Sequence, residues 1–183
     1  MPTKEQRFVF YRNALAFAVV VAAGLLQNSL WLPEVRGARA FILLPVVCVT
    51  ALFFSVPVSF AAGIAAGAVW DIASTTPDGY LAVYLGFSGL LCAVLVRRYM
   101  RRSLRTAWLF CFVFSGLFVL IRTLVYASYF DFQGIPALFF QFFLPSFVYT
   151  VLLCPVIYAV LNRLYSILSD GFEKYKLVNR RIK

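Results

Sequence analysis

Two side chains, Asp71 and Arg122, carry charge within otherwise apolar stretches of this chain. A charge near the centre of a bilayer costs roughly 2.5–3.5 kcal/mol on insertion scales, so such groups face a bundle interior and find a partner there. An ion pair that sets helix register and a site for a ligand or partner protein both fit these two residues. No nucleophile–base constellation is visible, and one carboxylate alone is thin support for acid–base catalysis, so we expect no enzyme activity.

The other residue types exclude several kinds of site. The chain has no histidine, which removes His-based catalytic triads, HExxH zinc sites and histidine-ligated haem. Four cysteines fall within apolar runs and lack CxxC spacing, which favours small buried thiols over metal or disulfide chemistry. They are Cys48, Cys92, Cys111 and Cys154. We therefore expect no metal and no cofactor.

Membrane helices must position these residues. Of the 183 residues, 63% are hydrophobic and only 13% are charged, whereas a soluble domain carries about a quarter charged residues. The charge-free blocks are long enough to cross a hydrocarbon core of about 30 Å, because an α-helix rises about 1.5 Å per residue. The composition predicts an all-α integral membrane protein.

The distribution of Lys and Arg decides the number of spans. Region 40–76 would extend about 55 Å as one helix, which is too long for one crossing and slightly short for two. If it crosses twice, turning at 55–57, 14 of the 17 basic residues lie on one side, as the positive-inside rule requires of the cytoplasmic side. We predict a six-transmembrane-helix bundle with both termini cytoplasmic. The expected domain, 1–161, has spans at about 14–32, 40–54, 58–76, 79–96, 107–129 and 137–161. We expect the first span to be a retained helix, although its basic start resembles a signal peptide.

Polar side chains are expected to meet at one depth in this bundle. Asp71 would lie about 20 Å along the third span and Arg122 about 22 Å along the fifth, so the two could pair without bending either helix. Other polar residues reach a similar level. We predict a polar layer, or a shallow outward-facing cavity, lined by Gln27, Asn28, Asp71, Arg122 and Gln141.

Small residues mark two faces for close helix packing. On the third span, residues at four-residue spacing form one face that a neighbouring backbone can approach; they are Ser59, Gly63, Gly67 and Asp71. On the first span, a similar stripe consists of Ala14, Ala18 and Ala22. The first face favours packing inside the chain, and the stripe fits either ordinary packing or the docking of a second membrane protein.

Proline residues predict interruptions in two spans. Pro145 and Pro155 lie in the last span, and each removes a backbone hydrogen bond and invites a kink. Pro45 has the same expected effect in the second span. Such kinks persist in membranes when a neighbouring group satisfies the freed carbonyl.

The basic residues outside the spans form two cytoplasmic surfaces. The net charge of +10 does not indicate nucleic-acid binding, because these residues lie between or beside the spans. The loop arginines, which could also contact anionic lipids, are Arg97, Arg98, Arg101, Arg102 and Arg105. Residues 162–183 form a basic amphipathic tail, either as a continuation of the last helix or as a helix at the membrane surface.

The third span carries a family resemblance. The run from Gly63 through Gly67 and Asp71 to Gly79, followed by an apolar helix and the Arg-rich loop, resembles the bacterial rod-shape-determining MreD family. Leu25-Leu26-Gln27 and Pro45 are also similar to that family. The resemblance covers most of residues 15–110, and Arg122 lies outside it.

The resemblance implies a non-enzymatic scaffold of the bacterial inner membrane that belongs to the cell-elongation machinery. Such proteins associate with MreC, which has a large periplasmic domain, and through it with MreB, RodA and penicillin-binding protein 2. Their architecture is similar to that of the six-helix substrate-binding subunits of energy-coupling-factor transporters. A small-molecule-binding transporter subunit is therefore the alternative, and the stripe on the first span would then dock its transport partner.

Overall fold

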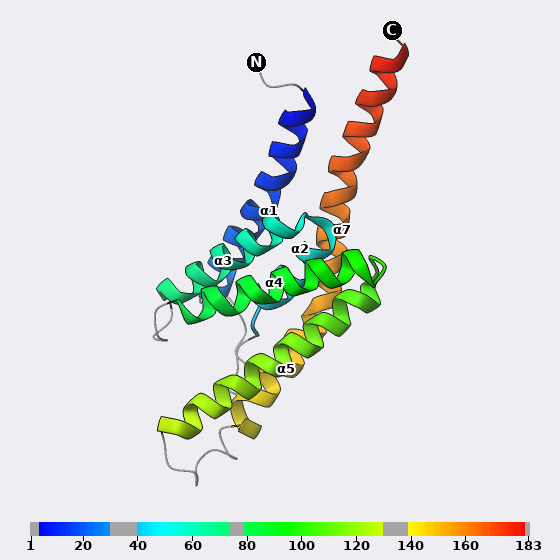
Figure 1. The fold of residues 1–183 in the computed structure, drawn as a ribbon. Coiled ribbons are helices and arrows are strands. Elements are labelled where there is room, and N and C mark those ends of the chain that lie inside the picture. The colour runs from blue at the N-terminus through cyan, green and yellow to red at the C-terminus, as the bar shows by residue number, and fades with distance from the viewer. Residues whose placement is uncertain (1–3, 30–39, 74–78, 130–138, 182–183) are drawn as a thin grey trace.

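A computed structural model describes residues 4–29, 40–73, 79–129 and 139–181, and these are all helix or short connections (Figure 1). Six α-helices and one π-helix follow one another within these ranges, which fits the helix number predicted from the charge pattern. They are α1 (Lys4–Asn28), α2 (Leu43–Phe53), α3 (Val56–Ala73), α4 (Tyr80–Arg98), α5 (Leu104–Tyr129), the π-helix η2 (Phe139–Phe143) and α7 (Leu144–Arg181).

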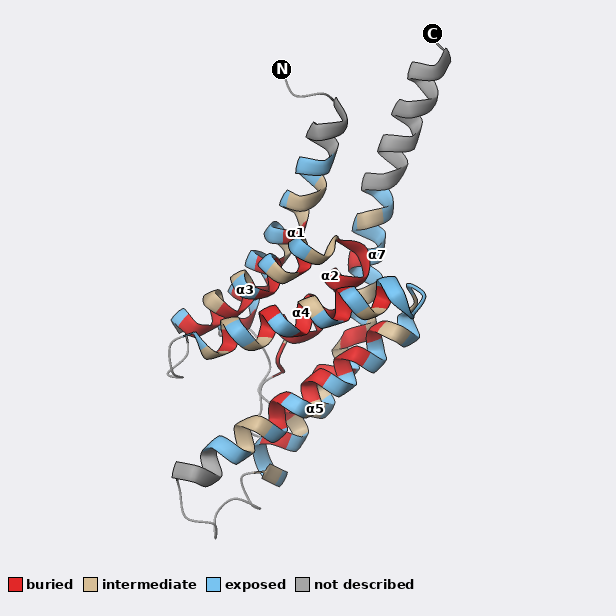
Figure 2. Ribbon diagram, viewed as in Figure 1, coloured by how far each residue is buried: buried red, intermediate tan, exposed pale blue. Residues whose placement is uncertain are grey.

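Four helical segments in the described part of the chain are long and apolar enough to cross a membrane: Val9–Asn28, Tyr80–Arg98, Leu104–Val125 and Phe139–Ile167. Large apolar side chains also cover the outside of the bundle, where Figure 2 shows exposed residues along the outer faces of the helices. Leu25, Leu120 and Leu152 are each more than half exposed. An apolar exterior of this extent suits a surface solvated by acyl chains.

The short helix α2 lies at the centre of the bundle. All of its 11 residues are buried, and it contacts α1, α3, α4, α5 and α7. A helix of this length extends only about 16 Å, half the thickness of the hydrocarbon core. It is therefore a half-helix enclosed by the others, shorter than the expected span at 40–54.

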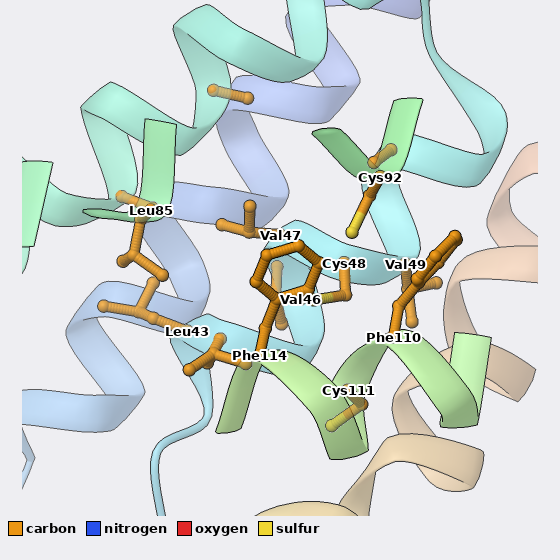
Figure 3. Packing of buried hydrophobic residues seen from close by; sticks show 14 of the residues in the cluster. Leu43, Val46, Val47, Cys48, Val49, Leu85, Cys92, Phe110, Cys111 and Phe114 are labelled. Carbon is orange, nitrogen blue, oxygen red and sulfur yellow. The ribbon is translucent and has the colours of Figure 1, made fainter. Parts of the chain in front are cut away.

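Packing around α2 separates the bundle into two helix pairs. Figure 3 shows Val47 and Cys48 of α2 between Leu85 of α4 and the aromatic rings of Phe110 and Phe114 on α5. Helices α3 and α4 form one closely packed pair, and α5 and α7 form the other. Although α4 and α5 are consecutive in the chain, each contacts α2 far more than it contacts the other.

The prolines fall where the backbone tolerates them. Pro45 lies in the first turn of α2, where an N–H would have no partner within the helix. Pro45 therefore removes no hydrogen bond within α2, and the kink expected there has no cause. Pro145 lies at the change from the π-helix η2 to α7, with helical backbone on both sides of it. Pro155 lies inside α7 and leaves the carbonyl of Val151 without its usual N–H donor. The indole N–H of Trp108 on α5 donates to that carbonyl at 3.2 Å.

This contact predicts that the stability lost on replacing Trp108 depends on whether residue 155 is proline. Trp108→Phe removes the donor and leaves the Val151 carbonyl unsatisfied, which should lower the free energy of unfolding by about 1–2 kcal/mol. Pro155→Ala supplies a backbone N–H to the same carbonyl. In that background, Trp108→Phe should cost less than about 0.5 kcal/mol beyond the lost ring contacts, as a double-mutant cycle measured by unfolding in detergent would show. Equal costs in both backgrounds would contradict this role.

The start of α1 and the end of α7 project from the same end of the bundle (Figure 1). The turn between α2 and α3 lies beside the end of α4, where the Arg97 guanidinium donates to the carbonyl of Phe54 at 3.4 Å. The aromatic rings of Phe53 and Tyr165 also meet there, 5.1 Å apart. Helix α7 continues to Arg181, so the tail extends the last helix.

Candidate functional site

The glycines of α3 place its backbone directly against α4. A Cβ atom on Gly63 would lie 2.9 Å from the Cα of Gly86 and would overlap the Leu85 carbonyl. A Cβ atom on Gly67 would overlap the backbone of Ala82. The small-residue face predicted on the third span therefore packs inside the chain, against α4.

Ser59 extends the same close contact by one turn. Its side chain is buried, and a Cβ atom on Gly89 of α4 would lie 2.7 Å from its backbone carbonyl. Glycines from both helices thus line the contact. This geometry lets backbone van der Waals contact replace side-chain packing over several turns.

Asp71 caps the start of α4 from across this contact. Its two carboxylate oxygens accept hydrogen bonds from the backbone N–H groups of Leu81, at 3.2 Å, and Ala82, at 3.0 Å. Gly79 precedes the helix with a positive φ of 85°, a conformation that favours glycine. The first-turn N–H groups of a helix have no partner of their own and carry partial positive charge. The carboxylate satisfies two of them away from water.

Arg122 is half-buried and faces a different set of groups. Its guanidinium carbon lies 5.9 Å from the centroid of the Phe118 ring, within the range of a cation–π contact. Phe118 is fully buried and packs against the rings of Phe41 and Trp70. The contacts described for Asp71 and Arg122 are therefore with different partners, and an ion pair between the two stays a prediction.

Gln27 holds the chain segment that enters α2. Its amide nitrogen donates to the carbonyl of Ala40 at 3.0 Å, and its amide oxygen accepts from the N–H of Ile42 at 2.6 Å. The N–H of Phe41 donates to the hydroxyl of Thr150 on α7 at 2.9 Å. Because α2 begins inside the bundle, its entering backbone must bond to protein groups.

Thr150 is the polar residue that the sequence reasoning missed. Its hydroxyl also donates to the carbonyl of Ser146, one turn earlier on α7, at 2.7 Å. A threonine within an apolar helix ordinarily bonds to its own preceding turn, so its residue type and spacing carried no separate signal. Only the approach of residue 41 shows its second role.

The predicted polar layer is divided among separate contacts. Gln27 and Asp71 are buried, and each satisfies the backbone at the start of a different helix. Asn28 and Gln141 are exposed. The structure therefore assigns structural bonds to the two buried members, and an outward-facing cavity among the five residues stays a prediction.

Because both carboxylate oxygens of Asp71 accept hydrogen bonds, we expect the stability of the protein to depend on these acceptor atoms more than on the negative charge. Asp71→Asn keeps one acceptor oxygen and should destabilise the protein by about 1–2 kcal/mol. Asp71→Leu removes both acceptors and should cost about 3–5 kcal/mol, because one buried and one half-buried N–H group lose their partner. Thermal unfolding in detergent measures both. If Asn and Leu proved equally harmful, the capping role would fail and the negative charge itself would be what matters.

The alanine stripe of α1 lies on the outward side of that helix. Ala14, Ala18 and Ala22 are all exposed, whereas Ala16 and Val20 on the opposite side are buried in the core. The stripe therefore does not serve packing inside the chain. It forms a shallow apolar face of small residues on the surface of the bundle.

The arginine loop between α4 and α5 has an ordered backbone. The Ser103 hydroxyl accepts the N–H of Thr106, and the Thr106 hydroxyl donates to the carbonyl of Arg101 at 2.9 Å. All five loop arginines are exposed, and Arg97 additionally contacts the end of α2. The loop thus presents its positive charge from a defined turn at the end of the bundle where α1 begins.

The four cysteines are buried as free thiols. Within the described ranges, no group of three His, Cys, Asp or Glu side chains could hold a metal ion.

No protein-family model, no curated protein and no solved structure matches the chain. The arrangement of its own residues is therefore the basis for assigning a function.

Proposed function

We propose that the chain is a non-enzymatic scaffold of the bacterial inner membrane, similar to MreD proteins, that helps to maintain rod shape in the cell-elongation machinery. The proposal is supported by the position of the four residues that resemble the family, which lie at the contact between α3 and α4. Gly63, Gly67, Asp71 and Gly79 together build the α3–α4 pair. A carboxylate that accepts two backbone N–H groups is poorly placed to act as a general base.

The proposed orientation places both termini and the arginine loop in the cytoplasm. Five exposed arginines beside the membrane would attract anionic lipids with about 1 kcal/mol each. The opposite end of the bundle would then face the periplasm. This arrangement lets the chain contact MreC within the membrane and, through it, MreB, RodA and penicillin-binding protein 2.

The outward alanine stripe of α1 is the proposed contact for the transmembrane helix of MreC. Ala14, Ala18 and Ala22 are exposed and leave room for a second helix to approach closely. In lipid, helix association depends on this kind of van der Waals contact, because apolar side chains gain little by leaving acyl chains. A larger side chain at the centre of the stripe would hold the partner away.

Co-purification with MreC tests the proposal. Tagged chain co-expressed with MreC should recover it from mild detergent, and Ala18→Leu should lower that recovery at least about fivefold, equivalent to roughly 1 kcal/mol of lost packing. Val113→Leu is the matched control, because Val113 is an exposed apolar residue on α5. Recovery of an ATPase-coupled transport module with a bound vitamin, and without MreC, would instead support the transporter alternative.

A further inference from the structure

The arginine loop carries positive charge that its own part of the chain does not neutralise. Five arginines lie within residues 97–105, and all five are exposed. No Asp or Glu occurs in residues 79–130, which include the whole of α4 and α5. The hydrogen bond that Arg97 donates to the carbonyl of Phe54 has a neutral acceptor. A cluster of guanidinium groups without a neighbouring carboxylate gains free energy from an anionic partner.

The backbone of the loop holds these arginines in a defined arrangement. The N–H of Tyr99 donates to the carbonyl of Leu95 at 2.9 Å, which closes the end of α4. The N–H of Ala107 donates to the carbonyl of Ser103 at 3.1 Å, which begins α5. Only residues 99–103 connect the two helices. An anion that binds here therefore meets arginines whose backbone is already ordered, which lowers the entropy cost of binding.

An exposed apolar face follows one arginine on each of the two helices. On α4, Leu91 lies seven residues before Arg98, so the two side chains share one side of the helix. On α5, Leu109 and Phe112 lie four and seven residues after Arg105 and share its side in the same way. All five side chains are exposed. Each helix thus places a guanidinium beyond an apolar surface, as a phospholipid places a phosphate beyond its acyl chains.

The two faces extend from one turn along two separate helices. Figure 1 shows α4 and α5 meeting at the loop and running apart from it, and the two helices make few contacts with each other. Figure 2 shows exposed residues at both helix ends and on the loop between them. Two positions for a phosphate therefore lie at one loop, above two apolar surfaces. A lipid with one phosphate and two acyl chains would cover only one of these surfaces.

We propose that the arginine loop binds a phospholipid with two phosphates and four acyl chains, the chemistry of cardiolipin. One phosphate contacts Arg98 and the other contacts Arg105, and the acyl chains lie along the exposed faces of α4 and α5. Arginine suits both positions, because its planar group offers several N–H donors to one phosphate. This site deepens the proposed lipid contact and rests on the proposed orientation, in which the loop lies at the cytoplasmic membrane surface.

Lipid binding measured by native mass spectrometry tests this preference. The full chain in mild detergent is titrated with cardiolipin and, separately, with phosphatidylglycerol at equal phosphate concentration. We expect cardiolipin to bind at least about tenfold more tightly, because one molecule brings both phosphates to the loop. Arg98→Gln and Arg105→Gln should each weaken cardiolipin binding about fivefold, the equivalent of about 1 kcal/mol for one arginine at an anionic surface.

Arg163→Gln is the matched control, because Arg163 is an exposed arginine of α7 outside the loop. It should weaken cardiolipin binding less than about twofold. A loss as large as that of Arg98→Gln would show that total charge attracts the lipid, and it would overturn the proposal. Equal binding of the two lipids would also overturn it, as would displacement of cardiolipin by millimolar inorganic pyrophosphate, a diphosphate without acyl chains.

Ala18→Leu separates this proposal from the proposed function. That variant tests the contact with MreC, and Ala18 lies on α1, away from the arginine loop. It should therefore keep the preference for cardiolipin while it lowers the recovery of MreC. Loss of the lipid preference in Ala18→Leu would contradict a site confined to the loop. Failure to recover MreC with an intact lipid preference would contradict the proposed function alone.

Discussion

Gly67→Ala is expected to lower the free energy of unfolding by about 2–3 kcal/mol or more. The added Cβ would overlap the backbone of Ala82 rather than the end of a flexible side chain. Backbone cannot rotate away, so α3 must separate from α4. The separation also pulls Asp71 from the N–H groups that it caps. Unfolding in detergent and the yield of monodisperse protein both measure the loss.

Gly116→Ala is the matched control for this prediction. Gly116 also lies within a helix, but a Cβ atom there would be 3.6 Å from the Phe147 ring, an ordinary contact distance. The better helix propensity of alanine should make this variant neutral or slightly stabilising. If Gly67→Ala were as stable as Gly116→Ala, the close α3–α4 contact would not exist in the protein.

Gln27→Leu is expected to cost about 2–5 kcal/mol, because it leaves one buried and one half-buried backbone group without the Gln27 amide as partner. The carbonyl of Ala40 and the N–H of Ile42 both bond to the Gln27 amide. Water cannot replace these bonds inside an apolar bundle. The entrance to α2 should therefore loosen, and amide exchange of the α2 backbone should rise before the other helices respond.

Asn28→Leu is the neighbouring control, because Asn28 is exposed and the same chemical change there removes no described backbone bond. It should alter stability by less than about 0.5 kcal/mol. Thr150→Val tests the other side of the same entrance, where its hydroxyl accepts the N–H of Phe41. We expect a cost of about 1–3 kcal/mol. Equal behaviour of the Gln27 and Asn28 variants would show that the amide does not anchor α2.

The contact between α3 and α4 was predictable in part from the spacing of residues along the third span. Four-residue spacing from Ser59 to Asp71 predicts a close-packed face, since residues four apart lie on one side of a helix, and the structure places that face against α4. The role of Asp71 was not predictable in the same way. Its partners, Leu81 and Ala82, offer backbone N–H groups, and a backbone donor has no sequence signature.

The α1 stripe illustrates the opposite case. Ala14, Ala18 and Ala22 predict a close-packing face equally well, yet they point outward. Ala16, Val20 and Ala23 on the other side face the core. In a membrane helix both sides are apolar, so hydrophobicity does not distinguish the inner face from the outer one as it does in water.

The sequence by itself determined the class of the protein: a bundle of apolar helices, with a helix number readable from charge. These properties follow from local composition, because a bilayer requires every spanning segment to be apolar and to satisfy its own backbone bonds. Only the tertiary structure decided that Asp71 and Gln27 cap helix starts, and that the helix at Leu43–Phe53 is an enclosed half-helix. Those outcomes depend on which backbone groups reach which side chains across the bundle.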